Sequence, residues 1–322
     1  MLTEIMPRGA LLFAPMESIT DPVWRRSVVE TCPGWDVLAC DFLRVPGAGK
    51  YPVKHLRAHI GDDFLADPHW APRTMYQILA SEKSHTTTIA AQLHDLGVPW
   101  VDLNIGCPSN TVCKSGGGSY LLRDLELMAR IVRDVRTHFP GRFTCKVRVG
   151  WTDGGDFDEI INILNGEGVE MITVHGRTRE QLYKEPANWA WIKRAVEISQ
   201  VPIVGNGDVW EAADAHRMLA ETGCHAVMVA RGALKTPWLP LHYRQGLPDS
   251  PEARWEMVRL FLSNYVGKLL EGGIHETGLC KQMKSVTRYV LDGLPDGAAI
   301  RRRVLLSQTS AGIFEVLGLQ AP

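Results

Sequence analysis

The chain has 322 residues, of which 45% are hydrophobic and 22% charged, and its formal net charge is −1. This balance is ordinary for a soluble globular protein and excludes an overall basic field, so any nucleic-acid surface must be a local patch. The seven cysteines contain no Cys-x-x-Cys pair, which argues against a disulfide framework and a structural zinc site and favours the reducing cytoplasm. We expect neither a signal peptide nor a membrane span, because no apolar run approaches roughly 20 residues.

Short apolar runs alternate along the chain with amphipathic segments, such as Asp124–His138 and Asp156–Glu167. Eight of these strand–helix units in about 240 residues predict a (β/α)₈ TIM barrel. A doubly wound open sheet is the alternative, but no G-x-G-x-x-G follows the first strand. The predicted strands are Ala10–Ala14, Val37–Leu43, Met75–Leu79, Val101–Ile105, Phe143–Val149, Met171–His175, Pro202–Asn206 and Ala226–Ala230.

The composition changes after Tyr243. Gln245–Pro251 is polar and contains Pro and Gly, as linkers do. The segments Glu252–Gly267 and Leu279–Leu291 that follow show helical periodicity without strand signals. We therefore predict a barrel domain over residues 1–246 and a small all-α helical domain over residues 247–322.

The stretch Val101–Ser109 is the most informative of the chain. A buried strand ends at Asn104, the chain breaks at Gly106, and Cys107 precedes a proline and the glycine triplet Gly116–Gly118. In α/β enzymes such loops place side chains at the carboxyl edge of the sheet, which favours a catalytic Cys107. The alternative is a small apolar core residue, which is how most free cysteines behave.

Polar residues at the other strand ends predict an anionic ligand on the same barrel face. Lys146 lies inside an apolar strand and is costly to bury without an anion, such as the N1–C2=O edge of a reduced flavin, or an ion-pair partner. His175 fits either a flavin contact or a satisfied core histidine. The turns Asn206–Asp208 and Ala230–Gly232 suit a phosphate, unless Arg231 pairs with a carboxylate.

Taken together, these motifs resemble the tRNA-dihydrouridine synthase family, and the fit is closest to its C subfamily. The resemblance rests on Ala14–Glu17, Asp102–Pro108, Lys114–Gly118, Lys146–Trp151, Val174–Thr178, Asn206–Asp208 and Ala230–Ala233, which cover the barrel in order. Asp41–Val45 supports the subfamily assignment.

The resemblance implies an FMN-dependent enzyme that uses NADPH, or NADH, as a transient reductant. It reduces a uridine of the tRNA D-loop, position 16 in this subfamily, to 5,6-dihydrouridine. Hydride goes to C6 and a proton from Cys107 goes to C5, which suits a thiol that is mostly protonated at neutral pH. The implied FMN contacts are Pro15, Met16, Glu17, Gln77, Lys146, His175, Asn206, Gly207, Asp208, Ala230 and Arg231.

The resemblance also implies residues that contact tRNA. Asn104 holds the uracil edge, and Asp41 and Tyr183 touch tRNA at the barrel rim. In the predicted helical domain, Leu279–Arg303 carries six basic and two acidic residues, which gives a local charge of +4. This concentration of positive charge favours RNA contact over a merely solvated surface. The predicted contacts there are Lys281, Lys284, Arg288 and Arg301. We expect a monomer.

Two other functions fit parts of this pattern. An FMN barrel oxidoreductase acting on a free small molecule, similar to dihydroorotate dehydrogenase, shares the flavin and the catalytic residue but does not need a basic tail. A tRNA-binding module with a decayed flavin site is disfavoured, because Cys107, Lys146 and Arg231 are all present.

Overall fold

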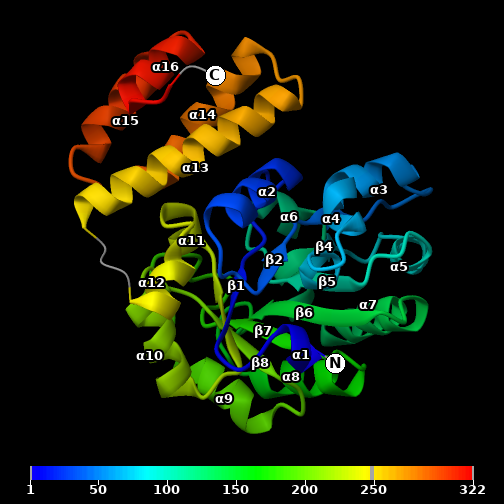
Figure 1. Cartoon of the computed structure of the whole chain (residues 1–322). Coiled ribbons are helices and arrows are strands. Elements are labelled where there is room, and N and C mark those ends of the chain that lie inside the picture. The colour runs from blue at the N-terminus through cyan, green and yellow to red at the C-terminus, as the bar shows by residue number, and fades with distance from the viewer. Residues whose placement is uncertain (1, 247–249, 321–322) are drawn as a thin grey trace. The chain divides into compact units, whose positions relative to one another are not determined.

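The computed structural model of the chain describes residues 2–246 and 250–320. The strands within these residues all pair in parallel and form one sheet (Figure 1). They are β1 (Ala10–Phe13), β2 (Val37–Ala39), β3 (Leu43–Arg44), β4 (Thr74–Leu79), β5 (Trp100–Ile105), β6 (Arg142–Arg148), β7 (Ile172–His175), β8 (Ile203–Asn206) and β9 (Ala226–Val229).

The sheet closes on itself. Its order is β2-β1-β9-β8-β7-β6-β5-β4, and β2 also pairs with β4, so eight strands form a ring. β1, β4 and β5 are buried along their whole length, as expected of parallel strands covered on both faces. The predicted (β/α)₈ TIM barrel is therefore confirmed.

The predicted strand Val37–Leu43 is interrupted. Leu38 pairs with Thr74 and Leu43 pairs with Ile78, so five residue steps on one side match four on β4. The one extra residue leaves Asp41 and Phe42 between β2 and β3, outside the ladder. Such a bulge redirects side chains at the rim of a barrel.

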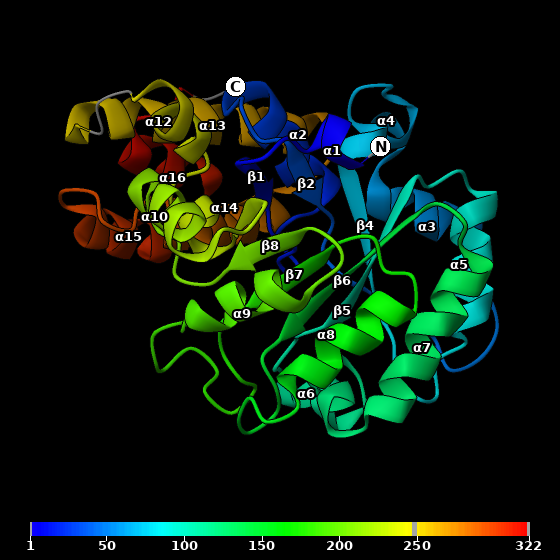
Figure 2. The same ribbon diagram turned by 90° about the horizontal axis from the view of Figure 1, so that it is seen from below.

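Helices connect the strands, and α5, α7, α8 and α9 follow one another around the outside of the sheet (Figures 1 and 2). Asp124 caps α7 by accepting a 2.9 Å hydrogen bond from the Leu127 amide. The helices up to residue 222 are α1 (Leu2–Ile5), α2 (Pro22–Thr31), α3 (Val53–Ile60), α4 (Asp62–Ala66), α5 (Thr86–Asp95), α6 (Asn110–Lys114), α7 (Leu125–His138), α8 (Phe157–Gly166), α9 (Ala190–Ile198) and α10 (Ala212–Thr222), with short 3₁₀ helices at Ala71–Arg73 and Gly118–Arg123.

The barrel interior changes from apolar to polar along the strands. Leu12, Met75, Trp100 and Met228 belong to one buried apolar cluster. Nearer the carboxyl ends, the strand register places polar side chains side by side in two successive levels. Gln77, Asp102 and Thr144 form the first level, and Asn104, Lys146 and Thr173 form the second. Of these side chains, Asn104 bonds directly to the loop that follows its strand.

The chain divides into two compact units. The barrel unit comprises Met1–Pro22, Asp36–Asp208 and Asp214–Ala230, and the helical unit comprises Val23–Trp35, Val209–Ala213 and Arg231–Pro322. The predicted linker Gln245–Pro251 includes residues 247–249, which lie outside the described residues, so the division after Gly246 stays a prediction.

The later helices belong to the helical unit, together with most of α2. Trp24 of α2 packs edge-on against Phe261 and Tyr265 of α13, with ring centroids 4.8 and 5.7 Å apart. Glu30 forms a 2.8 Å ion pair with Lys268. These helices are α11 (Arg231–Lys235), α12 (Leu239–Gln245), α13 (Pro251–Glu271), α14 (Glu276–Val290), α15 (Gly297–Leu306) and α16 (Ser310–Leu317).

All seven cysteines are free thiols. Over residues 2–246 and 250–320, no helix combines the length and the apolar character that crossing a membrane requires. The same residues contain no group of three His, Cys, Asp or Glu side chains arranged to hold a metal ion.

Candidate active site

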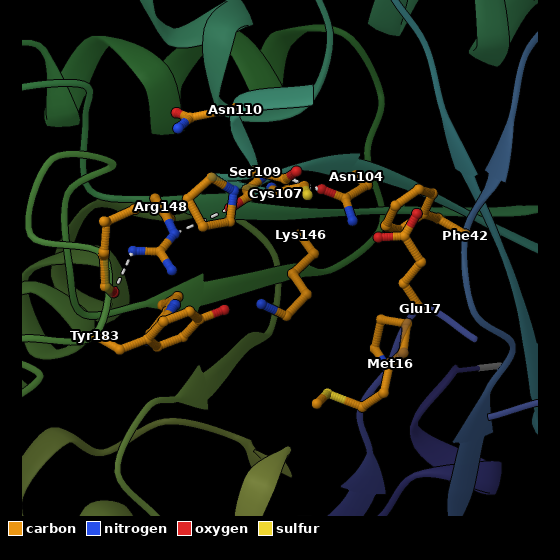
Figure 3. A pocket seen from close by; sticks show the side chains of 15 residues that line it. Met16, Glu17, Phe42, Asn104, Cys107, Ser109, Asn110, Lys146, Arg148 and Tyr183 are labelled. Carbon is orange, nitrogen blue, oxygen red and sulfur yellow. Dashed lines mark hydrogen bonds between the residues drawn. The ribbon is translucent and has the colours of Figure 1, made fainter. Parts of the chain in front are cut away.

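A pocket of about 450 Å³ opens at the carboxyl ends of the barrel strands. Its size is typical of a small-molecule or cofactor site. All of its walls come from the barrel unit, and Figure 3 shows how the side chains converge. The lining residues are Pro15, Met16, Glu17, Phe42, Asn104, Gly106, Cys107, Pro108, Ser109, Asn110, Lys146, Arg148, His175, Leu182 and Tyr183.

The loop after β5 places Cys107 in this pocket. The Asn104 carboxamide oxygen accepts hydrogen bonds from the amides of Gly106 (3.0 Å) and Cys107 (2.8 Å). On the other side, the Ser119 amide donates to the Cys107 carbonyl (3.0 Å). Gly118 has a φ of +60°, and a Cβ there would lie 2.8 Å from that carbonyl. Glycine is therefore required at 118 for the chain to pass so close to the cysteine.

Burial raises the pKa of the Cys107 thiol, and the nearby Glu17 carboxylate acts in the same direction. The side chain is half-buried and lines the pocket. A thiol with a raised pKa keeps its proton at neutral pH, which suits a proton donor better than a nucleophile.

Lys146 extends from β6 into the pocket (Figure 3). No carboxylate among the described residues lies within ion-pairing distance of its ammonium group, so the structure does not contain the alternative ion pair. Burial lowers the pKa of Lys146 to about 8, and the neighbouring Arg148 cation adds to this effect. The Asp102 carboxylate attracts the ammonium group and opposes this lowering of the pKa. A largely enclosed cation with no carboxylate in ion-pairing contact is arranged to meet an anionic or electron-rich ligand.

His175 lies at the end of β7 and also lines the pocket. Arg177 donates a 3.2 Å hydrogen bond to its Nε2, so this nitrogen is an acceptor and the neutral ring carries its proton on Nδ1. Gly207 has a φ of +118°, and a Cβ there would lie 2.8 Å from the His175 ring and from the Ala187 Cβ. Glycine at 207 leaves the space that the imidazole occupies.

Five predicted FMN contacts line the pocket, namely Pro15, Met16, Glu17, Lys146 and His175. The others in the barrel unit, Gln77, Asn206, Gly207, Asp208 and Ala230, are not among its lining residues. Asn206 donates to the Met228 carbonyl (2.8 Å), and Asp208 forms an ion pair with Arg177. Arg231 begins the helical unit, where its guanidinium lies 4.7 Å from the Trp210 ring centre.

The predicted tRNA contacts fall into both units. In the barrel unit, Asn104 and Tyr183 line the pocket, and Tyr183 is 53% exposed. Asp41 does not line it and accepts a hydrogen bond from the Ser18 amide (3.2 Å). In the helical unit, α14 presents Lys281, Lys284 and Arg288 at three- and four-residue steps, which places them on one helix face, and α15 carries Arg301.

Arg148 is a pocket residue for which the sequence predicted no role. It donates hydrogen bonds to the carbonyls of Gly106 (3.0 Å), Thr178 (2.7 Å) and Leu182 (3.1 Å), and it lies 5.3 Å from the Tyr183 ring centre. It thus joins the Cys107 loop to the loop that carries Tyr183. The available signal was a second cation two positions after Lys146, on the same face of a buried strand.

Comparison with known proteins places these observations in a family. The family model described as Dihydrouridine synthase (Dus) matches residues 12–312. The chain belongs to the dihydrouridine synthase family. The resemblance seen in its motifs is thereby confirmed.

Curated relatives named tRNA-dihydrouridine(16) synthase match nearly the whole dihydrouridine synthase chain. The protein from Cupriavidus necator is 34% identical over 314 residues, covering 95% of this chain and 96% of the relative. Those from Escherichia coli K12 and Pseudomonas putida are 32% and 33% identical and cover 88% and 97% of this chain. The alignments cover 90% of the Escherichia coli protein and 97% of the Pseudomonas putida protein.

Two solved structures share the fold of this dihydrouridine synthase family member. A 2-naphthoyl-CoA reductase complex with 2-naphthoyl-CoA has a TM-score of 0.57 at 12% identity, and histamine dehydrogenase from Rhizobium sp. 4-9 has 0.55 at 12%. The alignments cover 77% and 80% of this chain and 53% and 48% of those chains. This chain therefore spans about half the length of each, and the likeness concerns the barrel fold alone.

Proposed function

We propose that this protein reduces uridine 16 of tRNA to 5,6-dihydrouridine, with FMN as its bound cofactor and NADPH as the reductant. The observation that carries the proposal is that a protonated thiol, Cys107, and a cation in no ion-pair contact, Lys146, line the same pocket. Membership of the dihydrouridine synthase family and the names of its relatives support the reaction and the position.

The pocket fits a flavin in its volume and in its charge. Lys146 supplies the positive charge for an electron-rich ring edge, and the neutral His175 ring lies at the same strand ends. Pro15, Met16 and Glu17, which follow β1, also line the pocket. When bound, the flavin supplies the hydride that uracil C6 receives. The proposal also keeps the remaining predicted FMN contacts, which are Gln77, Asn206, Gly207, Asp208, Ala230 and Arg231.

Cys107 is the residue that completes the reaction by giving its proton to uracil C5. Because burial raises the pKa of the thiol, the proton is present at neutral pH before the reaction begins. The thiolate formed then regains a proton from water at the open side of the pocket. The lysine charge at 146 stabilises negative charge in the pocket while the proton is transferred.

Asn104 acts toward the base as a donor only. Its carboxamide oxygen is occupied by two backbone amides, and one N–H of Nδ2 is used by Gln77 (2.8 Å). The other N–H of Nδ2 remains to meet a uracil carbonyl oxygen. This restricts the role assigned to Asn104 from the motifs, because an Asn held in this way cannot accept from the uracil N3–H.

The tRNA is held partly outside the pocket in this proposal. Tyr183 offers an exposed aromatic face on which an extruded base stacks, and Asp41 lies at the rim. In the helical unit, Lys281, Lys284, Arg288 and Arg301 neutralise backbone phosphates. The proposal also places the protein in the cytoplasm, with its tRNA substrate, and takes it to be a monomer.

Mapping dihydrouridine in tRNA from cells that lack this protein tests the proposal. Dihydrouridine at position 16 should disappear and should return with the wild-type chain but not with Cys107→Ala. Loss at another position instead would overturn the choice of uridine. Unchanged dihydrouridine at every site would reject the function, and turnover of free uridine by the purified enzyme would reject tRNA as the substrate.

A further inference from the structure

A buried chain of hydrogen bonds runs from the barrel interior to the loop of Cys107. Asp102 lies near the middle of β5, is fully buried and does not line the pocket. Its Oδ2 accepts from Gln77 Nε2 (2.7 Å), and Gln77 Oε1 accepts from Asn104 Nδ2 (2.8 Å). Asn104 Oδ1 then accepts from the backbone of Gly106 and Cys107. We call Asp102, Gln77 and Asn104 the amide relay.

The hydrogen bonds of the amide relay can run in only one donor-to-acceptor direction. An ionised carboxylate accepts hydrogen bonds and cannot donate them, so Gln77 must turn its NH₂ group toward Asp102. Its oxygen then faces Asn104, which must turn its own NH₂ group toward Gln77. The Asn104 oxygen is thereby left facing the backbone amides of the loop. An acceptor oxygen at residue 102 thus sets the orientation of two carboxamides, and this orientation is the one that the Cys107 loop requires.

The other oxygen of Asp102 is used as well. Thr144 Oγ1 donates to Oδ1 (2.6 Å) and itself accepts from Trp100 Nε1 (3.0 Å). Every member of the network is buried. Burial raises the pKa of Asp102 to about 6, so the carboxylate is ionised above that pH but held there against a desolvation cost. A side chain that only filled space would be apolar at this position.

From this geometry we propose that Asp102 is a positioning residue for the reaction, because it orients Gln77 and Asn104 and through them the loop of Cys107. The proposal deepens the proposed function and rests on Cys107 being the proton donor. Asp102 itself does not touch substrate or cofactor.

Two variants separate this role from charge and from packing. In Asp102→Asn, the new carboxamide keeps its oxygen toward Gln77 and turns its NH₂ group toward Thr144, whose hydroxyl rotates to accept. The relay survives without the charge. Asp102→Leu has a similar shape but leaves Gln77 without an acceptor, so the relay is lost.

The expected result is a split between these variants. Asp102→Asn should keep uridine reduction and the rate of Cys107 alkylation by iodoacetamide within about threefold of wild type. Asp102→Leu should lower kcat about tenfold, leave the tRNA KM and the NADPH-dependent flavin reduction within twofold, and change the alkylation rate at least threefold. Thr173→Val is the matched control, since Thr173 is a buried hydroxyl without a hydrogen-bond partner among the described residues.

Equal losses in both variants would assign the effect to the charge of Asp102, and wild-type values in both would remove its role. The alkylation rate is measured without tRNA or NADPH. A defect in the relay therefore changes the alkylation rate even when the proposed reaction is wrong. Failure of the relay proposal can thus be told apart from failure of the proposed function.

A second test avoids the apolar variant, which could fail to fold. In Asn104→Asp, a carboxylate faces the Gln77 oxygen, and the melting temperature should fall by about 5 °C. Adding Asp102→Asn permits the reversed relay, in which the new carboxamide at position 102 donates to Gln77 and Gln77 donates to the new carboxylate at position 104. The double variant should regain most of the loss.

The double variant would also relieve repulsion between two carboxylates. The same variants are therefore compared in a Gln77→Met background, which separates this explanation from the relay. With Gln77→Met the relay has no central carboxamide, and the rescue should vanish if it passes through residue 77. Rescue that persists in the Gln77→Met background would overturn the proposal, because only direct charge repulsion would then couple residues 102 and 104.

Discussion

The amide relay and Lys146 are two polar regions of one barrel interior that the protein treats in opposite ways. In the relay, the oxygens of Asp102 and Gln77 meet donors at 2.6–2.8 Å within the protein. Lys146, on the neighbouring strand, makes no ion pair with a carboxylate among the described residues, although the Asp102 carboxylate attracts it from a distance. Buried polar groups that are satisfied internally hold a structure in one arrangement, whereas an unpaired charge is held ready for a ligand. The comparison assigns positioning to the relay and binding to the lysine.

The largest effect is expected at Cys107, where the relay ends. Cys107→Ala should lower dihydrouridine formation about 10²–10⁴-fold, the usual contribution of a positioned general acid. Flavin content and NADPH oxidation should stay at wild-type values, because Lys146 is untouched. The measurement compares single-turnover uridine reduction with flavin reduction monitored by absorbance. Loss of flavin from this variant would contradict the separation of the two regions.

Cys113 offers the matched control. It is buried and donates only a long hydrogen bond, 3.8 Å, to the Cys107 carbonyl. Cys113→Ala should keep uridine reduction within about threefold of wild type, since a sulfur hydrogen bond of this length contributes little. A defect as large as that of Cys107→Ala would show that the proton donor has been misassigned.

Lys146→Met should affect the other region. We expect flavin affinity to fall about 10- to 100-fold, the value of one charge-assisted interaction. The unliganded protein should at the same time become more stable by about 1 kcal/mol, because a buried charge is removed. Flavin titration and thermal unfolding measure the two effects, and Lys114→Met, at an exposed lysine of α6, is the control. Reduced stability of unliganded Lys146→Met would show that the lysine has a structural partner.

The pH dependence of flavin affinity and of stability also tests the role of the Lys146 charge. The pKa of Lys146 is lowered from 10.5 to about 8, so flavin affinity should weaken as the pH rises past about 8. Between these two values the unfolded chain binds more protons than the folded one, and the stability of the unliganded protein should therefore rise with pH in this window. In Lys146→Arg the loss of affinity should move to higher pH, because guanidinium keeps its proton. An unchanged pH midpoint in that variant would exclude residue 146 as its source.

The smallest effect is expected in the helical unit. Replacing Lys281 and Arg288 of α14 by alanine should raise the tRNA KM severalfold and lower the slope of log affinity against log salt by roughly 2, about 0.9 per lost phosphate contact. Flavin reduction should not change. Lys193→Ala, an exposed cation on α9, is the control and should leave the slope as it is. A slope equal to that of wild type in the double variant would remove α14 from the tRNA surface.

Much of the barrel could be predicted from local sequence. β4, β5 and β6 begin within one residue of their predicted starts, because a parallel strand is a continuous apolar run that ends in a glycine or a polar turn. The same logic identified the Cys107 loop and the cation at 146. The break at Asp41 was not predicted, because it arises from a one-residue mismatch with a strand that lies more than 30 positions further along the chain.

The sequence by itself determined which residues carry the chemistry: a thiol after β5, a lysine inside β6 and a set of glycine-containing turns. Only the tertiary structure decided how they are held. The hydrogen bonds of Asp102 join it to residues 25 and 42 positions away, and Arg148 bonds to carbonyls 30 to 42 positions away. Such orientations depend on which strands are neighbours in the closed ring. That pairing is a property of the whole barrel, and no single stretch of the chain contains it.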